Sequence, residues 1–363
     1  MNKISIGLLL PSSSIFPISK DFEKGLNAGL KQNDPDLEVE IIKAFIGQGS
    51  VSQTEDACNK FFTYDDADIV TGIISGKVAD EIAEKFNKRK TPLLVNTLGE
   101  YIPNFSKLGD HVFINSLNLW QHAWSLGYYG VKHFGKKGMF IGSVYDAGYD
   151  FSKMFHLGMK AADEESEWSF SVPPMPAPGQ LSNMDVIFPF LEQYQPDFVF
   201  AAFCGTETTM FINEFIKRGW QHRTKLLGLP YLLTPFSPLG DDISIYTTLL
   251  SEEHPELQPD RAFYHLGFQS GCMISQAALE NAASLSDSLS IQSHLVNKRY
   301  PEHIVAEINK AGKLSFVQND IKAHDTKISR QKIVEYEYMP HLSKINPPID
   351  EIRAGWYNPY LSI

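Results

Sequence analysis

Apolar residues follow two alternating patterns along this chain. One is a short, nearly continuous apolar run, as at the start of the sequence, which is typical of a parallel strand buried on both faces. The other places an apolar residue at every fourth position, as in Phe22, Leu26 and Leu30, which is typical of an amphipathic helix. Gly25 and Gly29 lie beside this stripe and predict a helix face that packs closely against a neighbour.

The two patterns take turns over most of the chain. They predict strands at residues 4–10, 39–45, 68–74, 91–95, 138–144, 169–172, 197–203 and 225–229. They predict helices around residues 22–30, 53–62, 78–86, 119–130, 151–162, 184–194 and 207–218. Farther on, we expect helices at 263–283 and 291–298, strands at 314–317 and 332–338, and a proline-rich aromatic tail.

A repeated strand–helix order predicts an α/β fold of two Rossmann-like lobes, each a parallel sheet flanked by helices. The length of 363 residues agrees, because a single hydrophobic core rarely serves so long a chain. We expect lobe I to comprise residues 1–117 and 250–330, and lobe II residues 118–249 and 331–363. The sequence has no low-complexity linker, so the lobes are expected to share short hinge crossings.

Charge and composition narrow the function classes. Lys and Arg number 32 against 43 Asp and Glu, a formal net charge of −11. This balance disfavours nucleic acid or an anionic membrane surface as a partner, since both require clustered cations. A small anionic ligand remains compatible with this charge, because it needs only a few hydrogen-bond donors. The three cysteines show no metal-binding spacing and are expected to act as small apolar residues.

Localisation stays open between two alternatives. No stretch approaches the roughly 20 apolar residues of a membrane span. Met1 is followed almost at once by the first predicted strand. The protein is therefore expected to be periplasmic if a leader has been removed, and cytoplasmic if Met1 is the native start.

The sequence contains none of the familiar catalytic or nucleotide-binding motifs. It has no P-loop, no H-E-x-x-H and no G-x-G-x-x-G. The stretch from Gly267 to Gly271 comes nearest to a nucleophile elbow, but its spacing is wrong and it lies in a predicted helix. We therefore expect a protein that is not an enzyme and uses no cofactor and no metal.

In open α/β sheets, ligands bind beyond the carboxyl ends of the strands, where loops lead into helix N-termini. Ser75 and Gly76 lie in such a loop, and the Ser75 hydroxyl with nearby backbone N–H groups would suit a carboxylate or amide oxygen. A plain helix cap is the alternative interpretation of this pair, and packing is the alternative for the tyrosines. The candidate ligand-binding residues are Phe16, Ser75, Gly76, Thr97, Gly99, Asn118, Tyr145, Tyr149, Thr206 and Tyr231.

Several loose motifs, in a fairly specific order and spacing over most of the chain, resemble the leucine/isoleucine/valine-binding proteins of the type I periplasmic-binding-protein family. They begin at residues 6–11 (IGLLLP), 22–25 (FEKG), 70–72 (VTG) with Ser75, and 91–93 (TPL). They continue at residues 112–115 (VFIN) with Asn118 and Gln121, and at 142–148 (GSVYDAG), 196–200 (PDFVF) and 312–316 (GKLSF).

The resemblance implies two lobes joined by a three-crossing hinge that close on a small polar ligand in the interlobe cleft. It implies that Ser75 and Thr97 hold a carboxylate or similar group, with Tyr145 and Thr206 closing from the other lobe. The ligand would be an amino acid, amide or small organic acid. The protein would be the substrate-binding component of an ABC transporter, with a permease as partner.

One departure bears on the ligand. Amino-acid binders of this family usually place acidic residues near the ligand ammonium. At the positions expected for those acids, this chain has Asn118 and Tyr231. Glu100 or Glu207 could replace them. The chain is also similar to the cytoplasmic amide sensor of amidase operons, in Thr97-x-x-Glu100 and Gly205-Thr206-x-Thr208 among other residues. That branch implies a short amide as ligand and a regulatory protein as partner.

Overall fold

The computed structural model describes most of the chain in two compact units. The described residues are 3–13, 17–102, 105–143, 149–174, 176–177, 180–233, 243–248, 250, 257, 259–279, 305–308 and 314–317. The first unit comprises Met1–Leu117, Asp260–Tyr300 and Arg353–Ser362. The second comprises Asn118–Pro259, Pro301–Ile352 and Ile363.

The first unit is built on a five-stranded parallel sheet with the order β2-β1-β3-β4-β5. Its strands are β1 (Ile4–Leu10), β2 (Val39–Phe45), β3 (Ile69–Ile73), β4 (Leu93–Thr97) and β5 (Val112–Ser116). Every residue of β3 and β4 is buried, as expected for central strands covered by helices on both faces.

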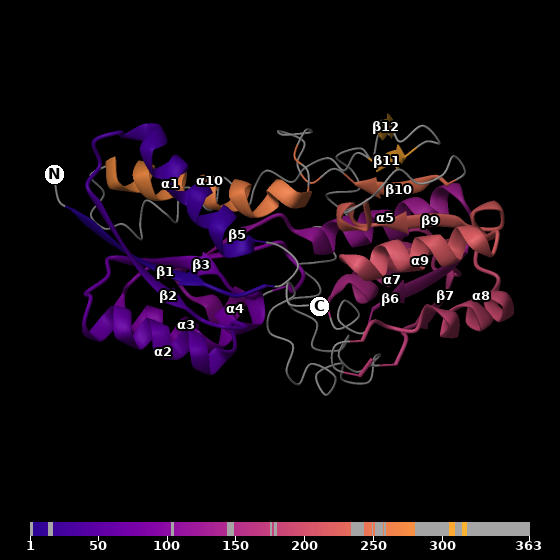
Figure 1. Cartoon of the computed structure of the whole chain (residues 1–363), viewed down its shortest axis with the longest axis horizontal. Helices are drawn as coiled ribbons and strands as arrows, with labels where there is room; N and C mark the ends of the chain where they lie inside the picture. The colour runs from indigo at the N-terminus through magenta and orange to yellow at the C-terminus, as the bar shows by residue number, and fades with distance from the viewer. Residues whose placement is uncertain are drawn as a thin grey trace. The chain divides into compact units, whose positions relative to one another are not determined.

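Helices cover both faces of this sheet. They are α1 (Ile18–Asn33), α2 (Val51–Thr63), α3 (Gly76–Arg89), the short α4 (Phe105–Leu108) and α10 (Ala262–Leu279). Figure 1 shows α2 and α3 on one side of the sheet and α1 beside α10 on the other. Leu93 and Val95 of β4 pack with Val78, Ile82 and Phe86 of α3 in a hydrophobic core.

Helices α1 and α10 cross at very short distance through glycines. A Cβ atom added at Gly25 would lie 2.0 Å from the Tyr264 carbonyl oxygen, and one added at Gly29 would lie 2.1 Å from that of Phe268. Gly267 on α10 meets α1 in the same way. The close-packed face predicted from Gly25 and Gly29 is confirmed.

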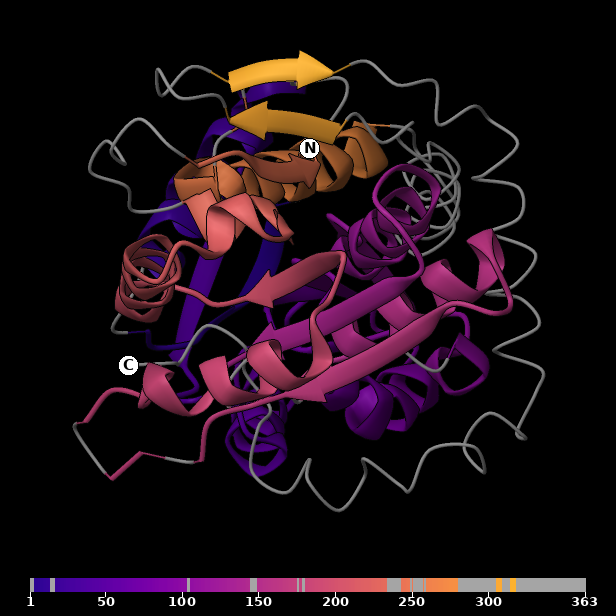
Figure 2. The same ribbon diagram turned by 90° about the vertical axis from the view of Figure 1, so that its right-hand side faces the viewer.

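The second unit contains a seven-stranded sheet with the order β12-β11-β10-β9-β8-β6-β7. Its strands are β6 (Lys137–Gly142), β7 (Glu167–Ser171), β8 (Phe198–Ala202), β9 (Lys225–Gly228), β10 (Ile245–Thr248), β11 (Val305–Ile308) and β12 (Leu314–Val317). The strands from β7 to β10 are parallel, whereas β11 and β12 add to the edge in antiparallel pairs. Figure 2 shows these last two arrows running in opposite directions.

Helices also cover both faces of the second sheet. They are α5 (Leu119–His133), α7 (Phe151–Ala162), α8 (Phe188–Tyr194) and α9 (Thr206–Lys217), with 3-10 turns η1 (Met184–Val186), η2 (Trp220–His222) and η3 (Pro230–Leu233). A further turn, η4 (Pro259–Arg261), precedes α10. Helices α5 and α7 pack together through glycines, because a Cβ at Gly158 would lie 1.9 Å from the Trp124 carbonyl oxygen. Phe211 and Phe215 of α9 belong to the core on the other face.

The predicted α/β architecture of two sheets flanked by helices is confirmed, with differences in detail. Residues 250–330 were assigned to lobe I, but β11 and β12 pair with the second sheet through β10, a strand that the sequence patterns did not predict. Strands β11 and β12 thus add an antiparallel edge to the otherwise parallel second sheet. The predicted elements at 291–298 and 332–338, and the tail, lie outside the described residues. The three-crossing hinge and the remaining lobe boundaries stay predictions.

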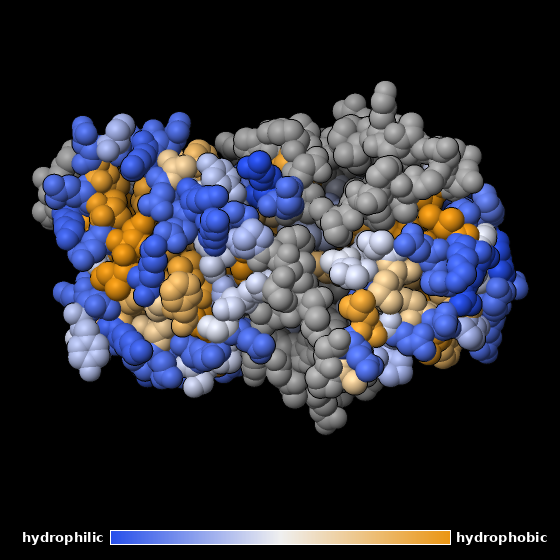
Figure 3. Space-filling model, viewed as in Figure 1, coloured by the Kyte–Doolittle hydropathy of each residue, from blue (hydrophilic) through white to orange (hydrophobic). Residues whose placement is uncertain are grey.

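In the residues that the structure describes, the surface and the cysteines show no feature that points to a reactive group. Within the described chain, no helix has the length and apolar character needed to cross a membrane. The face drawn in Figure 3 is mainly hydrophilic on both units, with apolar residues between the charged ones. Cys58 is buried and its burial raises the pKa of its thiol to about 12, whereas Cys204 and Cys272 are half-buried.

Candidate functional site

The carboxyl end of β3 leads directly into helix α3. Ser75 forms the N-cap of this helix, and its Oγ accepts a hydrogen bond of 3.3 Å from the Val78 backbone N–H. Gly76 is the first helical residue, and both residues are buried. Because the hydroxyl acts here as an acceptor, its own proton can still be donated to another group. The cap and the ligand-site interpretations of Ser75 are therefore compatible.

The neighbouring strand β4 ends in a polar turn. Thr97 Oγ1 donates a hydrogen bond of 2.6 Å to Glu100 Oε2 and accepts one of 3.2 Å from the Gly99 backbone N–H. Gly99 has φ +86°, a conformation that favours glycine and lets the chain turn back toward Thr97. Thr97 and Glu100 are only 2% and 1% exposed. The turn thus places a buried carboxyl group beside the end of a central strand.

A buried amide network supports this edge from the opposite face of the sheet. The Asn96 amide donates to Thr71 Oγ1 at 3.1 Å, and the Asn115 amide donates to Asn96 Oδ1 at 2.9 Å. Asn115 also donates to the Leu266 carbonyl of α10, at 3.1 Å. Ser270 of the same helix donates to Asn96 Oδ1 at 2.5 Å. These bonds tie α10 to β4 and β5 near the carboxyl ends of the two strands, where the candidate loops begin.

In the second unit, the strands β6 and β8 end side by side. The Ser143 backbone N–H donates to the Ala202 carbonyl at 3.1 Å, which keeps the two strands paired to their carboxyl ends. Tyr149 is buried and packs edge-on against Phe151, with ring centroids 5.6 Å apart. Packing therefore accounts for at least part of the role of Tyr149.

The loop after β8 leads into α9, whose first turn is rich in polar residues. Gly205 is the N-cap residue with φ +62°, and Thr206 begins the helix with an exposed side chain. Glu207 is buried and its Oε1 accepts a hydrogen bond of 2.9 Å from the Ser182 backbone N–H. Thr208 is fully buried, and within the described chain its hydroxyl and that of Ser182 have no hydrogen-bond partner.

The remaining candidate residues are distributed as follows. Asn118 is the N-cap residue of α5 in a left-handed conformation, with φ +53°, and makes no side-chain cap bond. Tyr231 lies in η3 and is buried. Phe16 and Tyr145 lie outside the described residues. The structure thus groups Ser75, Gly76, Thr97 and Gly99 at the carboxyl ends of the adjacent strands β3 and β4. In the second unit it places Tyr149 just before α7 and Thr206 at the first residue of α9.

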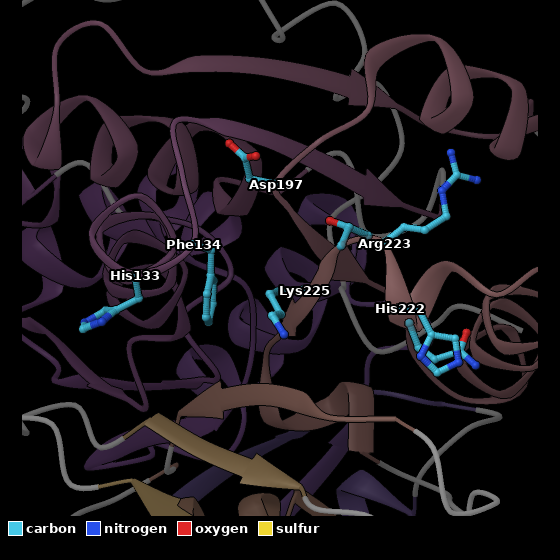
Figure 4. A pocket seen from close by; sticks show the side chains of 8 residues that line it. His133, Phe134, Asp197, His222, Arg223 and Lys225 are labelled. Carbon is cyan, nitrogen blue, oxygen red and sulfur yellow. The ribbon is translucent and has the colours of Figure 1, made fainter.

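A separate cavity of about 280 Å³ opens at the other end of the second sheet. It is lined by His133, Phe134, Asp197, Gln221, His222, Arg223, Thr224 and Lys225. Figure 4 shows that its charged groups diverge: the Asp197 carboxylate and the Arg223 guanidinium do not point toward one another. Arg223 instead pairs with Glu192, at 2.6 and 2.7 Å, and lies over the Trp220 ring. The lining does not form a convergent set of ligand groups.

Sequence reasoning missed two features of the carboxyl edges. It named Thr206, whereas the buried hydroxyls in that part of the second unit belong to Ser182 and Thr208. It also gave Thr97 as a ligand contact without its bond to Glu100. The Thr-x-x-Glu spacing was the available signal, since a threonine and a glutamate three residues apart lie close together in a tight turn or at a helix start. Among the described residues, no cluster of His, Cys, Asp or Glu could hold a metal ion.

A family model described as periplasmic binding protein matches residues 3–264, which is well over half of the chain. The chain belongs to the periplasmic binding protein family. The predicted resemblance to the type I, leucine-binding branch of this family is confirmed. No curated protein matched the sequence itself.

Solved structures of solute-binding and amino-acid-binding proteins share the fold. A leucine-binding protein of Thermotoga maritima is similar with a TM-score of 0.61 at 14% identity, covering 86% of this chain and 97% of its own. An isoleucine complex of a branched-chain amino acid transporter substrate-binding protein from Streptococcus pneumoniae has a TM-score of 0.60 at 13% identity, covering 87% and 99%.

A third structure is a solute-binding protein of an ABC transporter from Rhodopseudomonas palustris BisB5 in complex with 3,4-dihydroxybenzoic acid. It has a TM-score of 0.61 at 15% identity, covering 85% of this chain and 90% of its own. At these identities the likeness establishes the fold, not the ligand.

Proposed function

We propose that this periplasmic binding protein is the substrate-binding component of an ABC transporter and takes a small polar solute. The observation that carries the proposal is the set of buried polar groups at the carboxyl edge of the first sheet, headed by the Ser75 hydroxyl at the N-terminus of α3. Helix N-termini favour carboxylate and carbonyl oxygens, because their first N–H groups lack partners within the helix.

The second unit has polar groups of its own at the carboxyl edge of its sheet. Thr206 and the buried hydroxyls of Thr208 and Ser182 lie at or beside the N-terminus of α9. Within the described residues these two hydroxyls have no hydrogen-bond partner, which is costly for buried groups, and a bound polar molecule or water would satisfy them. We propose that these residues contribute to ligand recognition together with Tyr145 and Asn118.

The solved structures favour transport over sensing. The three proteins compared above are named as leucine-binding, substrate-binding or solute-binding proteins, two of them explicitly for a transporter. An amide-sensing role rests on the sequence resemblance alone. Two of these proteins were solved with isoleucine and with 3,4-dihydroxybenzoic acid, so amino acids and aromatic acids belong in the first panel of compounds to test.

Thermal shift with amino acids, short amides, aliphatic acids and aromatic acids tests this proposal. A ligand that binds only the folded state stabilises it by RT ln(1 + [L]/Kd), about 2.7 kcal/mol at a hundredfold excess over Kd. Ser75→Ala is expected to remove most of the shift produced by any hit. A panel that leaves the melting temperature unchanged at millimolar concentration contradicts the proposal.

Ser50→Ala is the matched control. Ser50 is the N-cap residue of α2, and its hydroxyl accepts from the Gln53 N–H at 3.3 Å, the same distance as in the Ser75 cap. Both variants lose a helix cap, worth about 1 kcal/mol. Only Ser75→Ala is expected to lose the response to ligand. An equal loss in both variants would show that Ser75 acts only as a helix cap.

A further inference from the structure

Strand β2 forms an outer edge of the first sheet. It stands at the end of the strand order β2-β1-β3-β4-β5, and among the described strands only β1 pairs with it. The backbone N–H and C=O groups on its outer side therefore have no ladder partner in the described part of the chain. Such a row of groups is a template on which the strand of another chain can pair.

The hydrogen bonds between β2 and β1 show which backbone groups face outward. The Glu38 carbonyl accepts a bond of 3.0 Å from the Ile4 N–H, and the Ile46 N–H donates one of 3.0 Å to the Leu10 carbonyl. Even-numbered positions of β2 therefore face β1. Because backbone groups alternate in direction along a strand, the odd-numbered positions direct their N–H and C=O groups outward.

Strand β2 lacks the features that usually prevent edge pairing. Natural proteins block free edges with unpaired charges, prolines, bulges or very short strands. Strand β2 is seven residues long, contains no proline and keeps its register with β1 without a bulge. Its two charged side chains, Glu40 and Lys43, form ion pairs within the chain, with Lys3 at 2.7 Å and with Glu23 at 2.5 Å. The edge is therefore long, regular and close to neutral.

Apolar side chains accompany this edge. Phe45 is 75% exposed at the end of the strand, and Val39 and Ile41 are half-buried. These three side chains lie on one face of the sheet, because residues two apart on a strand point the same way. An apolar band bordered by hydrophilic residues crosses the first unit in the region of β1 and β2 (Figures 1 and 3). Exposed apolar surface next to an open edge is typical of an interaction site.

A second copy of β2 is complementary to this edge when it runs antiparallel. Full overlap of the two strands is centred on Ile42, and it places Val39 opposite Phe45 of the second copy and Ile41 opposite Lys43. All four of these facing positions are odd-numbered, so the outward N–H and C=O groups meet as hydrogen-bonded pairs. The exposed Phe45 ring then packs against a β-branched side chain, a pair that stabilises sheets.

We propose that the outer edge of β2 is an interface between two copies of this protein, which pair antiparallel about a two-fold axis and join their first sheets into one. Full overlap satisfies both open edges at once, and the symmetry repeats each favourable contact. The interface follows the side of the sheet rather than the carboxyl ends of its strands. Pairing is therefore independent of whether the candidate ligand site is occupied.

Sedimentation velocity of the full-length protein over the micromolar range tests the interface. The wild type is expected to shift from the mass of one chain to twice that mass as its concentration rises. Phe45→Lys is expected to raise the dissociation constant at least about tenfold, because it removes two equivalent aromatic contacts from the pair. A wild type that remains monomeric throughout, or a Phe45→Lys variant that pairs as well as the wild type, overturns the proposal.

Tyr64→Lys is the matched control. Tyr64 is an aromatic residue of similar exposure, 82%, and it lies at the C-cap of α2 rather than on β2. The variant makes the same change in charge at the surface and is expected to pair like the wild type. An equal weakening in both lysine variants would show that net charge, and not the β2 edge, governs association.

A second pair of substitutions tests the register. Val39→Glu alone is expected to weaken pairing, because it places a carboxylate against the Phe45 ring. The double variant, Val39→Glu with Phe45→Lys, brings opposite charges face to face at two places and is expected to pair more tightly than either single variant. A double variant weaker than both overturns the antiparallel register. Should Val39→Glu fail to fold in a melting experiment, Phe45→Lys and Tyr64→Lys still decide the interface.

Discussion

At the residue scale, His156 shows how burial changes the chemistry of one side chain. Its ring stacks on Trp168 with centroids 4.5 Å apart, and its Nε2 is buried without a hydrogen-bond partner in the described part of the chain. Burial, and secondarily the charge of Lys160, lower the pKa of His156 from 6.5 to about 4. The folded protein therefore favours the neutral ring.

This lowered pKa predicts how stability depends on pH. The contribution of neutral His156 is fully present above the unfolded pKa of 6.5 and is lost as the pH falls toward about 4, because the unfolded chain then binds the proton first. His156→Phe keeps an aromatic ring against Trp168 and removes the titration. Its melting temperature is expected to fall less than that of the wild type between pH 7 and pH 4.5. A slope as steep as in the control His222→Phe would contradict the prediction.

The amide network under β4 makes a second prediction at this scale. Asn96→Leu has similar volume but removes the acceptor of the Ser270 hydroxyl, and it removes one hydrogen bond each from Thr71 and Asn115, which keep their bonds to the Leu94 and Leu266 carbonyls. An orphaned buried polar group costs about 1–3 kcal/mol and a lost hydrogen bond about 0.5–1.5 kcal/mol, so a loss of about 2–4 kcal/mol in the free energy of unfolding is expected by urea denaturation. Asn27→Leu, at an exposed site on α1, is the control and is expected to stay within about 0.5 kcal/mol.

At the element scale, the close crossing of α1 and α10 reverses the usual preference of a helix for alanine over glycine. Alanine normally stabilises a helix by up to about 1 kcal/mol relative to glycine. At Gly29 the added Cβ would lie 2.1 Å from the Phe268 carbonyl oxygen, so Gly29→Ala must push the helices apart. We expect the variant to lose about 2 kcal/mol or more on chemical denaturation. Lys31→Ala, two residues along and exposed, is expected to be neutral, and a stabilised Gly29→Ala would contradict the close crossing.

Elements were predictable where a single local signal determined them. The apolar runs located the buried strands, and the Phe22 stripe with its glycines located α1 and its packed face. One helix was predicted for residues 184–194, but η1 ends and α8 begins anew at Phe188 with Pro189 in its first turn. Proline lacks the N–H that would continue the helix across that point. The break therefore has a local cause, which the spacing of apolar residues does not reveal.

Other features depend on contacts that sequence spacing does not contain. Strand β10 is only four residues long and is held by β9 and β11 rather than by its own pattern. The acceptor for the Thr97 proton depends on how Gly99 turns the chain, and the burial of Thr208 depends on which face of α9 meets the core. Sequence patterns therefore predicted where the strands end better than they predicted the hydrogen bonds and the burial of the side chains at those ends.

At the scale of the whole molecule, each unit has a hydrophobic core of its own. The core around α2 and α3 uses residues from Leu9 to Ile114, and the core around α8 and α9 uses residues from Met139 to Ile245. The described part of each unit also contains a glycine-mediated helix crossing, α1 with α10 in the first and α5 with α7 in the second. Damage to one crossing should therefore be felt first in the unit that contains it.

Hydrogen exchange measured by mass spectrometry tests this independence with a pair of variants. Gly29→Ala lies in the first unit and Gly158→Ala in the second, and both place a Cβ about 2 Å from a backbone carbonyl oxygen, 2.1 Å and 1.9 Å respectively. A loss of about 2 kcal/mol confined to one unit speeds exchange of its core amides up to roughly thirtyfold. We expect Gly29→Ala to accelerate β1 and β3 while β6 and β8 keep wild-type rates, and Gly158→Ala to do the reverse. Equal acceleration of both sheets by either variant would show that the two cores open as one cooperative unit.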